Sequence, residues 1–219
     1  MLSGINFFKT LKKVLKGKGG PTLTFTLFHV IEALEVIGDE GSIGRVKLAK
    51  KLCLGEGATR TLLKHLKENK LIVIHPTSGC RLTETGKKLY RTIKSNLSRI
   101  IEIPKTSLSV GKYNAAILVR NAGKVVGYGL EQRDAAIKAG GVGATTLIYS
   151  DGKFVMPGFE AEDCIRDDEI SKLLISTLQP SNGDVVIIGG GLDRYTARMA
   201  TKMAAIETLK SMLSENTSE

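Results

Sequence analysis

The segment Gly55–Tyr90 constrains the fold more than any other part of the sequence, because its apolar periodicity changes twice. Residues 58–69 place leucines on one side and basic residues on the other, at the spacing of an amphipathic helix. A β-branched run at 71–74, a turn of polar residues and a short return run at 80–82 then predict a β-hairpin. Thr83 follows as the cap of another helix.

The stretch before this segment supplies two more helices. Residues 27–37 are typical of an amphipathic helix that ends at Gly38, and residues 44–52 of a short second helix. Residues 54–57 contain two glycines and form the turn into the helix at 58–69. The expected order of elements is helix, short helix, turn, helix and hairpin. This is the order of a helix-turn-helix with a wing.

In this region the chain resembles the winged-helix transcriptional regulators of bacteria and archaea. The resemblance covers residues 22–90, and its most specific part is the exit from the hairpin, a Leu-Thr-x-x-Gly pattern at 82–86. The positions that carry it are Val46, Leu48, Ala49, Thr59, Leu62, Leu63, Leu66, Leu71, Ile72, Leu82, Thr83 and Gly86. The resemblance implies binding of duplex DNA, and the alternative is a winged helix used only for protein contacts.

The charge of the chain is concentrated in the same half. Residues 1–103 hold 19 Lys and Arg against 8 Asp and Glu, whereas residues 104–219 hold 13 against 14. The whole basic excess therefore falls in the region that resembles a DNA-binding domain, which favours a polyanionic partner and salt-dependent affinity. A lysine-rich surface of the kind found in thermophiles is the alternative.

Residue type and position divide the candidate DNA contacts into two groups. The start of the third helix usually reaches base edges, and arginine can bind guanine through two hydrogen bonds, so Arg60 is the leading candidate for base contact. Basic residues of the second helix are better placed for phosphates, and Arg81 for backbone or minor groove. Lys87, Lys88 and Arg91 are interpreted as a solvated helix face. The full expected set is Arg45, Lys47, Lys50, Lys51, Thr59, Arg60, Thr61, Lys64, His65 and Arg81.

Length, composition and hydrophobic pattern limit the classes of protein to which the chain can belong. A chain of 219 residues suits two modest domains, and 42% hydrophobic residues supply a core. No apolar run approaches the ~18 residues of a membrane span, and the N-terminus lacks a secretory pattern, so we expect a cytoplasmic protein without a membrane partner. Residues 5–16 form a basic amphipathic pattern, expected to pack in a dimer or against the domain, with a membrane-surface helix as the alternative.

The reactive side chains form no recognisable metal or catalytic set. Cys53, Cys80 and Cys164 are scattered without zinc-ligand spacing, so we expect reduced structural thiols, with redox sensing as the alternative. No nucleophile, base and orienting group stand out by type and placement. The sequence therefore predicts no catalytic residues, no metal, no cofactor and no enzyme.

Residues 83–103 are predicted to form one long helix. Its apolar residues lie near the spacing of a helix–helix seam, at Leu89, Ile93, Leu97 and Ile100. The seam would either pair two copies into a homodimer or pack against the C-terminal half of the same chain, and both alternatives stay open. The expected organisation is a DNA-binding domain at 1–103, a linker at 104–112 after Pro104, and a sensor or assembly domain at 113–219.

The second half alternates between strand and helix patterns. Strands are expected at 114–120, 124–128, 145–149, 154–156 and 184–188, and helices at 132–139, 168–178 and 193–213. The pattern predicts a mixed α+β sandwich with helices on one face of a small sheet. The fold class of the whole chain is therefore α+β, a winged helix-turn-helix followed by this sandwich.

Residues 127–158, from Gly127 to Gly158, carry a second resemblance. They look like a little-characterised archaeal family in which an N-terminal winged helix precedes a C-terminal domain similar to the GAD-type insert of bacterial aspartyl-tRNA synthetases. The resemblance implies domain order and a GAD-like fold, and no reaction. It also raises the alternative of an RNA- or tRNA-associated protein.

Three consecutive glycines, Gly189–Gly191, lie between the last expected strand and the final helix. Glycines at such a junction let backbone amides approach a phosphate, so a nucleotide-binding enzyme is a further alternative. The stretch lacks the G-x-G-x-x-G pattern, and Asp193 would repel an anion, so close backbone packing is preferred. The expected function is a DNA-binding transcriptional regulator, a homodimer whose C-terminal domain senses a small-molecule effector or mediates dimerisation.

Overall fold

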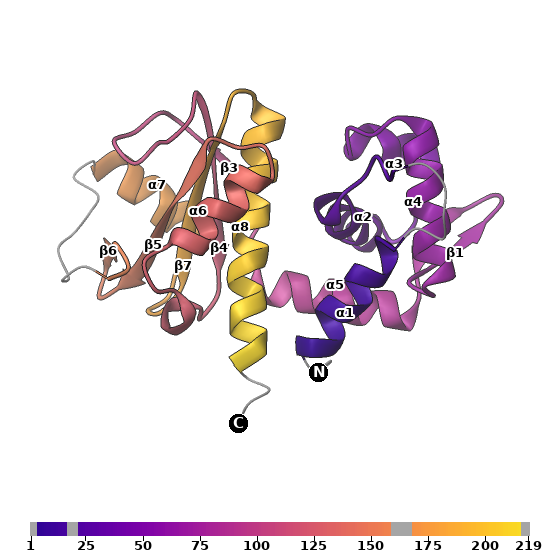
Figure 1. The fold of residues 1–219 in the computed structure, drawn as a ribbon, viewed down its shortest axis with the longest axis horizontal. Helices are drawn as coiled ribbons and strands as arrows, with labels where there is room; N and C mark the ends of the chain where they lie inside the picture. The colour runs from indigo at the N-terminus through magenta and orange to yellow at the C-terminus, as the bar shows by residue number, and fades with distance from the viewer. Residues whose placement is uncertain (1–3, 17–21, 159–167, 216–219) are drawn as a thin grey trace. The chain divides into compact units, whose positions relative to one another are not determined.

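The computed structural model describes residues 4–16, 22–158 and 168–215 (Figure 1). The chain divides into two compact units, Met1–Lys94 and Ser95–Glu219. This division falls earlier than the boundary expected at residue 103. The reason is that residues 101–103 pair with a strand of the second unit rather than extending a helix of the first.

The N-terminal unit has the predicted order of helices and hairpin. Three helices precede a two-stranded antiparallel hairpin, which we call the wing, and a further helix follows it. An additional helix begins the chain. The elements are α1 (Gly4–Val14), α2 (Leu27–Glu40), α3 (Arg45–Lys51), α4 (Glu56–Glu68), β1 (Ile72–His75), β2 (Gly79–Leu82) and α5 (Glu84–Asn96). The apolar faces of these helices meet in one core, and α1 buries Phe7, Leu11 and Val14 in it. The basic N-terminal helix is therefore a domain-packing helix.

Helix α2 continues three residues beyond its expected end at Ile37. Gly38 lies inside the helix, although glycine there costs about 1 kcal/mol relative to alanine. A side chain at this position would overlap the ring of Tyr90, whose Cγ lies 2.8 Å from the place of a Cβ atom. Gly38 is thus a packing residue and not a helix terminator.

Helix α5 ends at Asn96, so the predicted helix over 83–103 is too long. Leu97 bridges Val119, and the Ser98 amide donates to the Leu118 carbonyl, which draws the chain into the sheet of the second unit. Leu89 and Ile93 are fully buried within the single chain. The expected seam is therefore already occupied and is not free to pair two copies.

The C-terminal unit is built on one antiparallel sheet with strand order β3-β4-β7-β5-β6. Residues 124–128, expected as a strand, instead form the end of a 3-10 turn, η1 (Gly123–Val125), and the irregular segment after it. The other expected strands and helices are present. Their bounds are β3 (Ile101–Ile103), β4 (Tyr113–Val119), α6 (Leu130–Lys138), β5 (Gly143–Ser150), β6 (Lys153–Val155), α7 (Asp168–Leu178), β7 (Val185–Gly191) and α8 (Arg194–Glu215).

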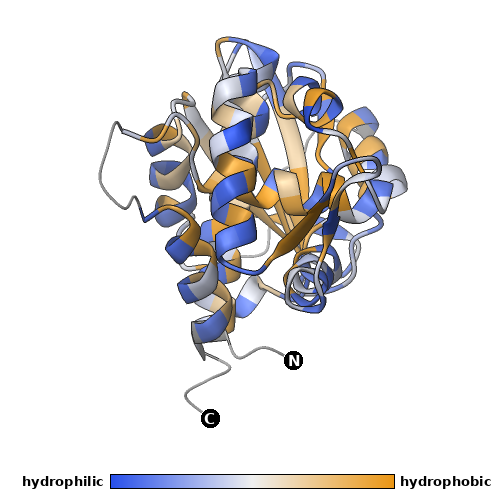
Figure 2. Cartoon of the chain, turned by 90° about the vertical axis from the view of Figure 1, so that its right-hand side faces the viewer, coloured by the Kyte–Doolittle hydropathy of each residue, from blue (hydrophilic) through white to orange (hydrophobic). Residues whose placement is uncertain are grey.

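Helices cover both faces of this sheet, so the expectation of helices on one face is wrong. Ile170, Leu174 and Leu178 of α7 pack in one cluster with Leu118 and Val186 of the central strands. Helices α6 and α8 lie on the opposite side (Figure 1). The strands are mostly hydrophobic and the helices carry hydrophobic colour along one side (Figure 2), as expected for a sheet enclosed between helices.

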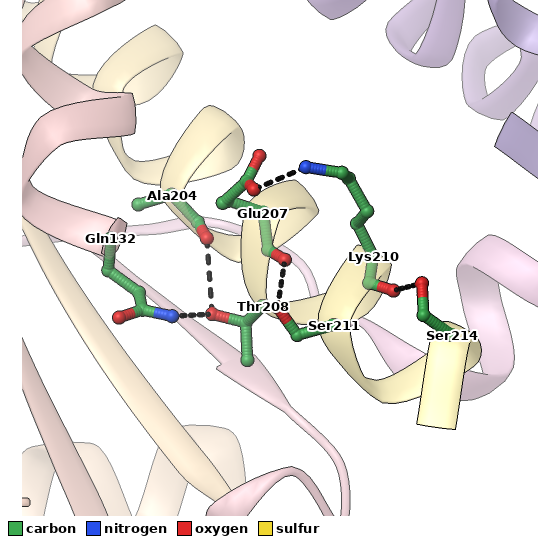
Figure 3. Close-up of polar contacts among 7 residues, drawn as sticks. All are labelled: Gln132, Ala204, Glu207, Thr208, Lys210, Ser211 and Ser214. Atoms are coloured by element: carbon green, nitrogen blue, oxygen red, sulfur yellow. Dashed lines mark hydrogen bonds and ion pairs between the residues drawn. The ribbon is translucent and has the colours of Figure 1, made fainter. Parts of the chain in front are cut away.

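A buried polar contact fixes α6 against α8. The Gln132 side-chain amide donates to the Thr208 hydroxyl at 3.0 Å, and that hydroxyl donates to the Ala204 carbonyl at 3.2 Å (Figure 3). Gln132 and Thr208 are 2% and 0% exposed, so the contact is made away from water. Such a bond adds orientation to the apolar packing of the two helices. The predicted α+β fold class, with a small C-terminal sheet, is confirmed.

Candidate nucleic-acid interface

The core of the candidate interface is the exposed face of α4. Leu62, Leu63 and Leu66 are buried, and this apolar stripe holds the helix in the core of the unit, where α4 contacts α1, α3 and β1. The opposite face exposes Arg60, Thr61 and Lys64, three of the predicted contacts, with Lys64 about one helical turn after the other two. The structure therefore brings these three side chains to one surface.

Arg60 and Lys64 stand free of acidic partners. In the described part of the chain, no ion pair involves either of them. Their charge is therefore available to an external anion. By contrast, the neighbouring α3 engages most of its cations in internal pairs.

The cations of α3 are tied to two glutamates. Lys47 and Lys51 both pair with Glu40, at 2.6 and 2.8 Å, and Arg45 pairs with Glu56 at 3.4 Å. Hydrogen bonds from the two lysines lower the pKa of Glu40 to about 2, so it keeps its negative charge at neutral pH. Lys50 is exposed. Three of these four predicted phosphate contacts therefore have an internal acidic partner.

Two of the predicted contacts, Thr59 and His65, make internal contacts and do not stand on the exposed face. Thr59 is 0% exposed and its hydroxyl donates to the Gly55 carbonyl, so it belongs to the buried stripe. His65 is half-buried. Its Nδ1 lies 2.7 Å from the Val14 carbonyl oxygen, and its ring makes an edge contact with Phe25. His65 therefore holds the end of α1 against α4 rather than reaching outward.

The wing is held by a third short strand segment. Ile43 exchanges backbone hydrogen bonds with Cys80, and the Ser42 hydroxyl donates to the Ser78 carbonyl near the tip. A side chain at Gly79 would overlap the Ile43 carbonyl. The hairpin is thereby tied to the turn that precedes α3, which fixes its position beside the helix-turn-helix.

Arg81 lies on the exposed side of the wing. It is opposite Val73 in the strand register, and both are exposed, whereas Cys80 and Leu82 on either side are buried. In the described residues, Arg81 also makes no ion pair with an acid. The predicted position of Arg81 at the surface of the wing therefore fits the structure.

The expected set of DNA contacts omits two residues of the α4 surface, Gly57 and Lys67. Helix α4 begins at Glu56, two residues before the expected start, which places Gly57 inside the helix one turn before Thr61. Gly57 is exposed, with nothing within 4 Å of a would-be side chain, so a nucleic-acid backbone could approach closely. Lys67 extends the same face by one turn beyond Lys64. Helical spacing from Arg60 and Lys64 would have found both.

The triple glycine is a packing element of the sheet. Gly189–Gly191 are strand residues of β7, and Gly189 and Gly190 face partners in both β4 and β5. A side chain at Gly189 or Gly191 would overlap the backbone of α8. These amides are part of the strand ladder and do not form a loop around a phosphate. This corrects the alternative of a nucleotide-binding enzyme that uses Gly189–Gly191.

The described residues, 4–16, 22–158 and 168–215, offer few candidates for a metal, membrane or thiol site. No group of three metal-ligating side chains occurs in those ranges, and no helix there has the length and hydrophobicity to cross a membrane. Cys53 is exposed, while Cys80 is buried and its thiol has a pKa raised by that burial. Cys164 lies outside the described residues.

Comparisons with known proteins match the two units separately. Residues 25–97 match the family described as the CggR N-terminal DNA binding domain, and residues 110–209 match a domain of unknown function, DUF4443. A solved structure, hypothetical protein PH0730 from Pyrococcus horikoshii OT3, is similar over 85% of this chain and 99% of its own, with 25% identity and a TM-score of 0.62. No curated protein matches. The matches support an N-terminal DNA-binding domain and an archaeal relative; the GAD-like resemblance stays a prediction.

Proposed function

We propose that the protein is a transcriptional regulator that binds duplex DNA through α4 and the wing. One observation carries the proposal. The match to a DNA-binding domain covers the helices and hairpin whose exposed face presents Arg60 and Lys64 without internal acidic partners. A helix of this kind fits the width of the major groove, and a hairpin beside it can contact the backbone.

The proposed DNA contact of each side chain follows from its position and charge. Arg60 and Thr61, near the start of α4, take base edges, and Lys64 and Lys67 further along take phosphates. Gly57 leaves space for the backbone. Lys50 and Arg81 flank the helix from α3 and the wing, and the paired residues Arg45, Lys47 and Lys51 contribute after exchanging a carboxylate for a phosphate.

The C-terminal unit is proposed to assemble two copies or to sense an effector. It exposes large apolar side chains on and around α6, namely Tyr128, Leu130, Ile137 and Val142, which are 71%, 50%, 49% and 46% exposed. Exposed apolar side chains that cluster are typical of protein contacts. A homodimer formed here would present two α4 helices to one duplex.

The test is fluorescence anisotropy of the full chain with mixed-sequence duplex DNA and with RNA, over a series of salt concentrations. The variant Arg60→Ala/Lys64→Ala removes two free cations of α4, and Lys138→Ala/Lys153→Ala removes two exposed cations of the C-terminal unit as the matched control. We expect steep salt dependence, with a log–log slope that falls by about 0.9 for each phosphate contact removed. The control should leave affinity and slope unchanged.

Two results would overturn the proposal. The first is a lack of duplex binding at low salt, and the second is equal affinity for the α4 variant and the control. Preference for RNA that survives the α4 substitutions would instead favour the RNA-associated alternative, because the major groove of A-form RNA is too narrow for a helix.

A further inference from the structure

A cavity of about 630 Å³ lies in the N-terminal unit, between the end of α2, the wing and the first turns of α5. Three basic residues line it: Arg81 from β2, and Lys87 and Arg91 from α5. Lys87 and Arg91 are four residues apart and so share one face of the helix. The ring of Tyr90 forms another part of the wall, and Gly38 leaves room for that ring.

The charges around the cavity are not balanced internally. Lys87 pairs with Glu84 at 2.7 Å, but neither Arg81 nor Arg91 makes an ion pair within the described residues. Glu40 is the acid that lines the cavity, and it already binds Lys47 and Lys51. Asp39 nearby accepts the Tyr90 hydroxyl at 2.7 Å and pairs with Lys94. Two guanidinium groups therefore line the cavity without an ion pair in the described residues, although Glu84 also interacts electrostatically with Arg91.

We propose that this cavity binds a phosphoryl group, held by Arg81 and Arg91, with the Tyr90 ring packing against the rest of the ligand. Guanidinium groups bind phosphate through paired hydrogen bonds of fixed geometry, which lysine cannot reproduce. The volume lies in the range of small-molecule sites and exceeds what a single phosphate fills. The phosphoryl group belongs either to a free small molecule or to a nucleic-acid backbone, since the recognition chemistry is the same.

Occupancy would link the wing to α5, in addition to the Tyr90–Asp39 hydrogen bond and the Lys94–Asp39 ion pair that already join α5 to α2. Arg81 belongs to the wing, Arg91 to α5, and Gly38 to α2. An anion held between the two arginines reduces their repulsion and restrains the wing relative to the helix-turn-helix. The inference does not depend on the proposed function, because anion binding is measured without DNA.

The experiment is isothermal titration calorimetry of the full chain with pyrophosphate at constant ionic strength. Arg81→Gln and Arg91→Gln remove the proposed ligands, and Lys88→Gln removes an exposed cation of α5 that lies outside the cavity. We expect saturable 1:1 binding that weakens at least about tenfold in each cavity variant and persists in Lys88→Gln. Arg91→Lys, which keeps the charge, should recover only part of the affinity.

Absence of saturable binding to the unaltered protein would overturn the inference, as would an equal loss in Lys88→Gln. The source of the phosphoryl group is resolved by anisotropy with labelled duplex. Pyrophosphate that displaces DNA from the unaltered protein but not from Arg91→Gln indicates a backbone phosphate in the cavity. Pyrophosphate that binds without displacing DNA indicates a free phosphorylated ligand.

Discussion

Replacing Gly189 by alanine tests whether the triple glycine packs a helix or binds a ligand. Gly189 lies in the central strand β7, where α8 crosses the sheet. A Cβ atom there would lie 2.6 Å from the Thr201 backbone nitrogen and 2.7 Å from its Cα. These atoms belong to a buried helix turn and cannot rotate away, so α8 must shift from the sheet.

The expected cost follows from this geometry. Overpacking of a core typically costs 1–3 kcal/mol, and contact with backbone atoms places Gly189→Ala at about 3 kcal/mol. Reduced freedom of the unfolded chain returns less than about 1 kcal/mol. At about 3–5 °C per kcal/mol, the melting temperature of the C-terminal unit should fall by roughly 10 °C.

The assay is urea and thermal unfolding of the full chain, with Gly127→Ala as the control. Gly127 is exposed and has nothing within 4 Å of the added methyl group, so its substitution should change stability by less than about 1 kcal/mol. If Gly189→Ala unfolds at the same urea concentration as the control, the packing explanation is wrong. Unchanged stability with lost nucleotide binding would restore the phosphate-loop interpretation.

Three further predictions concern single contacts. His65→Ala removes the bond to the Val14 carbonyl and should lower stability by about 1–2 kcal/mol, with faster hydrogen exchange in α1. Thr208→Val keeps the shape but leaves the Gln132 amide unpaired, so urea unfolding should show a loss of about 1–3 kcal/mol. Donation to a carboxylate raises the pKa of Tyr90 to about 12, so its contribution to stability is present below pH 10 and is lost between pH 10 and 12. Alkaline titration should show a late tyrosinate step that Tyr90→Phe removes.

The N-terminal unit was largely predictable because its signals are local. The leucine spacing of α4 and the turn residues of the wing specify helix and hairpin without reference to distant parts of the chain. The same spacing also explains why Thr59 is buried. Thr59 lies three and four residues before Leu62 and Leu63 and therefore shares their buried face of the helix. His65 could not be resolved in this way, because its partner Val14 is 51 residues away.

The features of the C-terminal unit that the sequence did not predict depend on pairing between residues far apart in the chain. The end of α5 is set by Leu97 and Ser98 pairing with β4, and no residue near position 96 is a helix breaker. The covering of both sheet faces did leave a sequence signal. Residues 115–119 and 185–188 are apolar without alternation, which is typical of strands enclosed on both sides, and the structure buries all of them. That continuous run argued against a sandwich with helices on a single face.

Internal ion pairs determine which cations of the N-terminal unit can bind a polyanion without first breaking another contact. Lys47 and Lys51 share Glu40, whose lowered pKa keeps it ionised at neutral pH, so a phosphate must compete with a carboxylate for them. Exposed ion pairs add little to stability, so this exchange is feasible, but it releases less bound salt than neutralisation by a free lysine. Lys64 has no such competitor in the described residues. The unpaired face of α4, rather than the more densely basic α3, is therefore where salt-dependent affinity should originate.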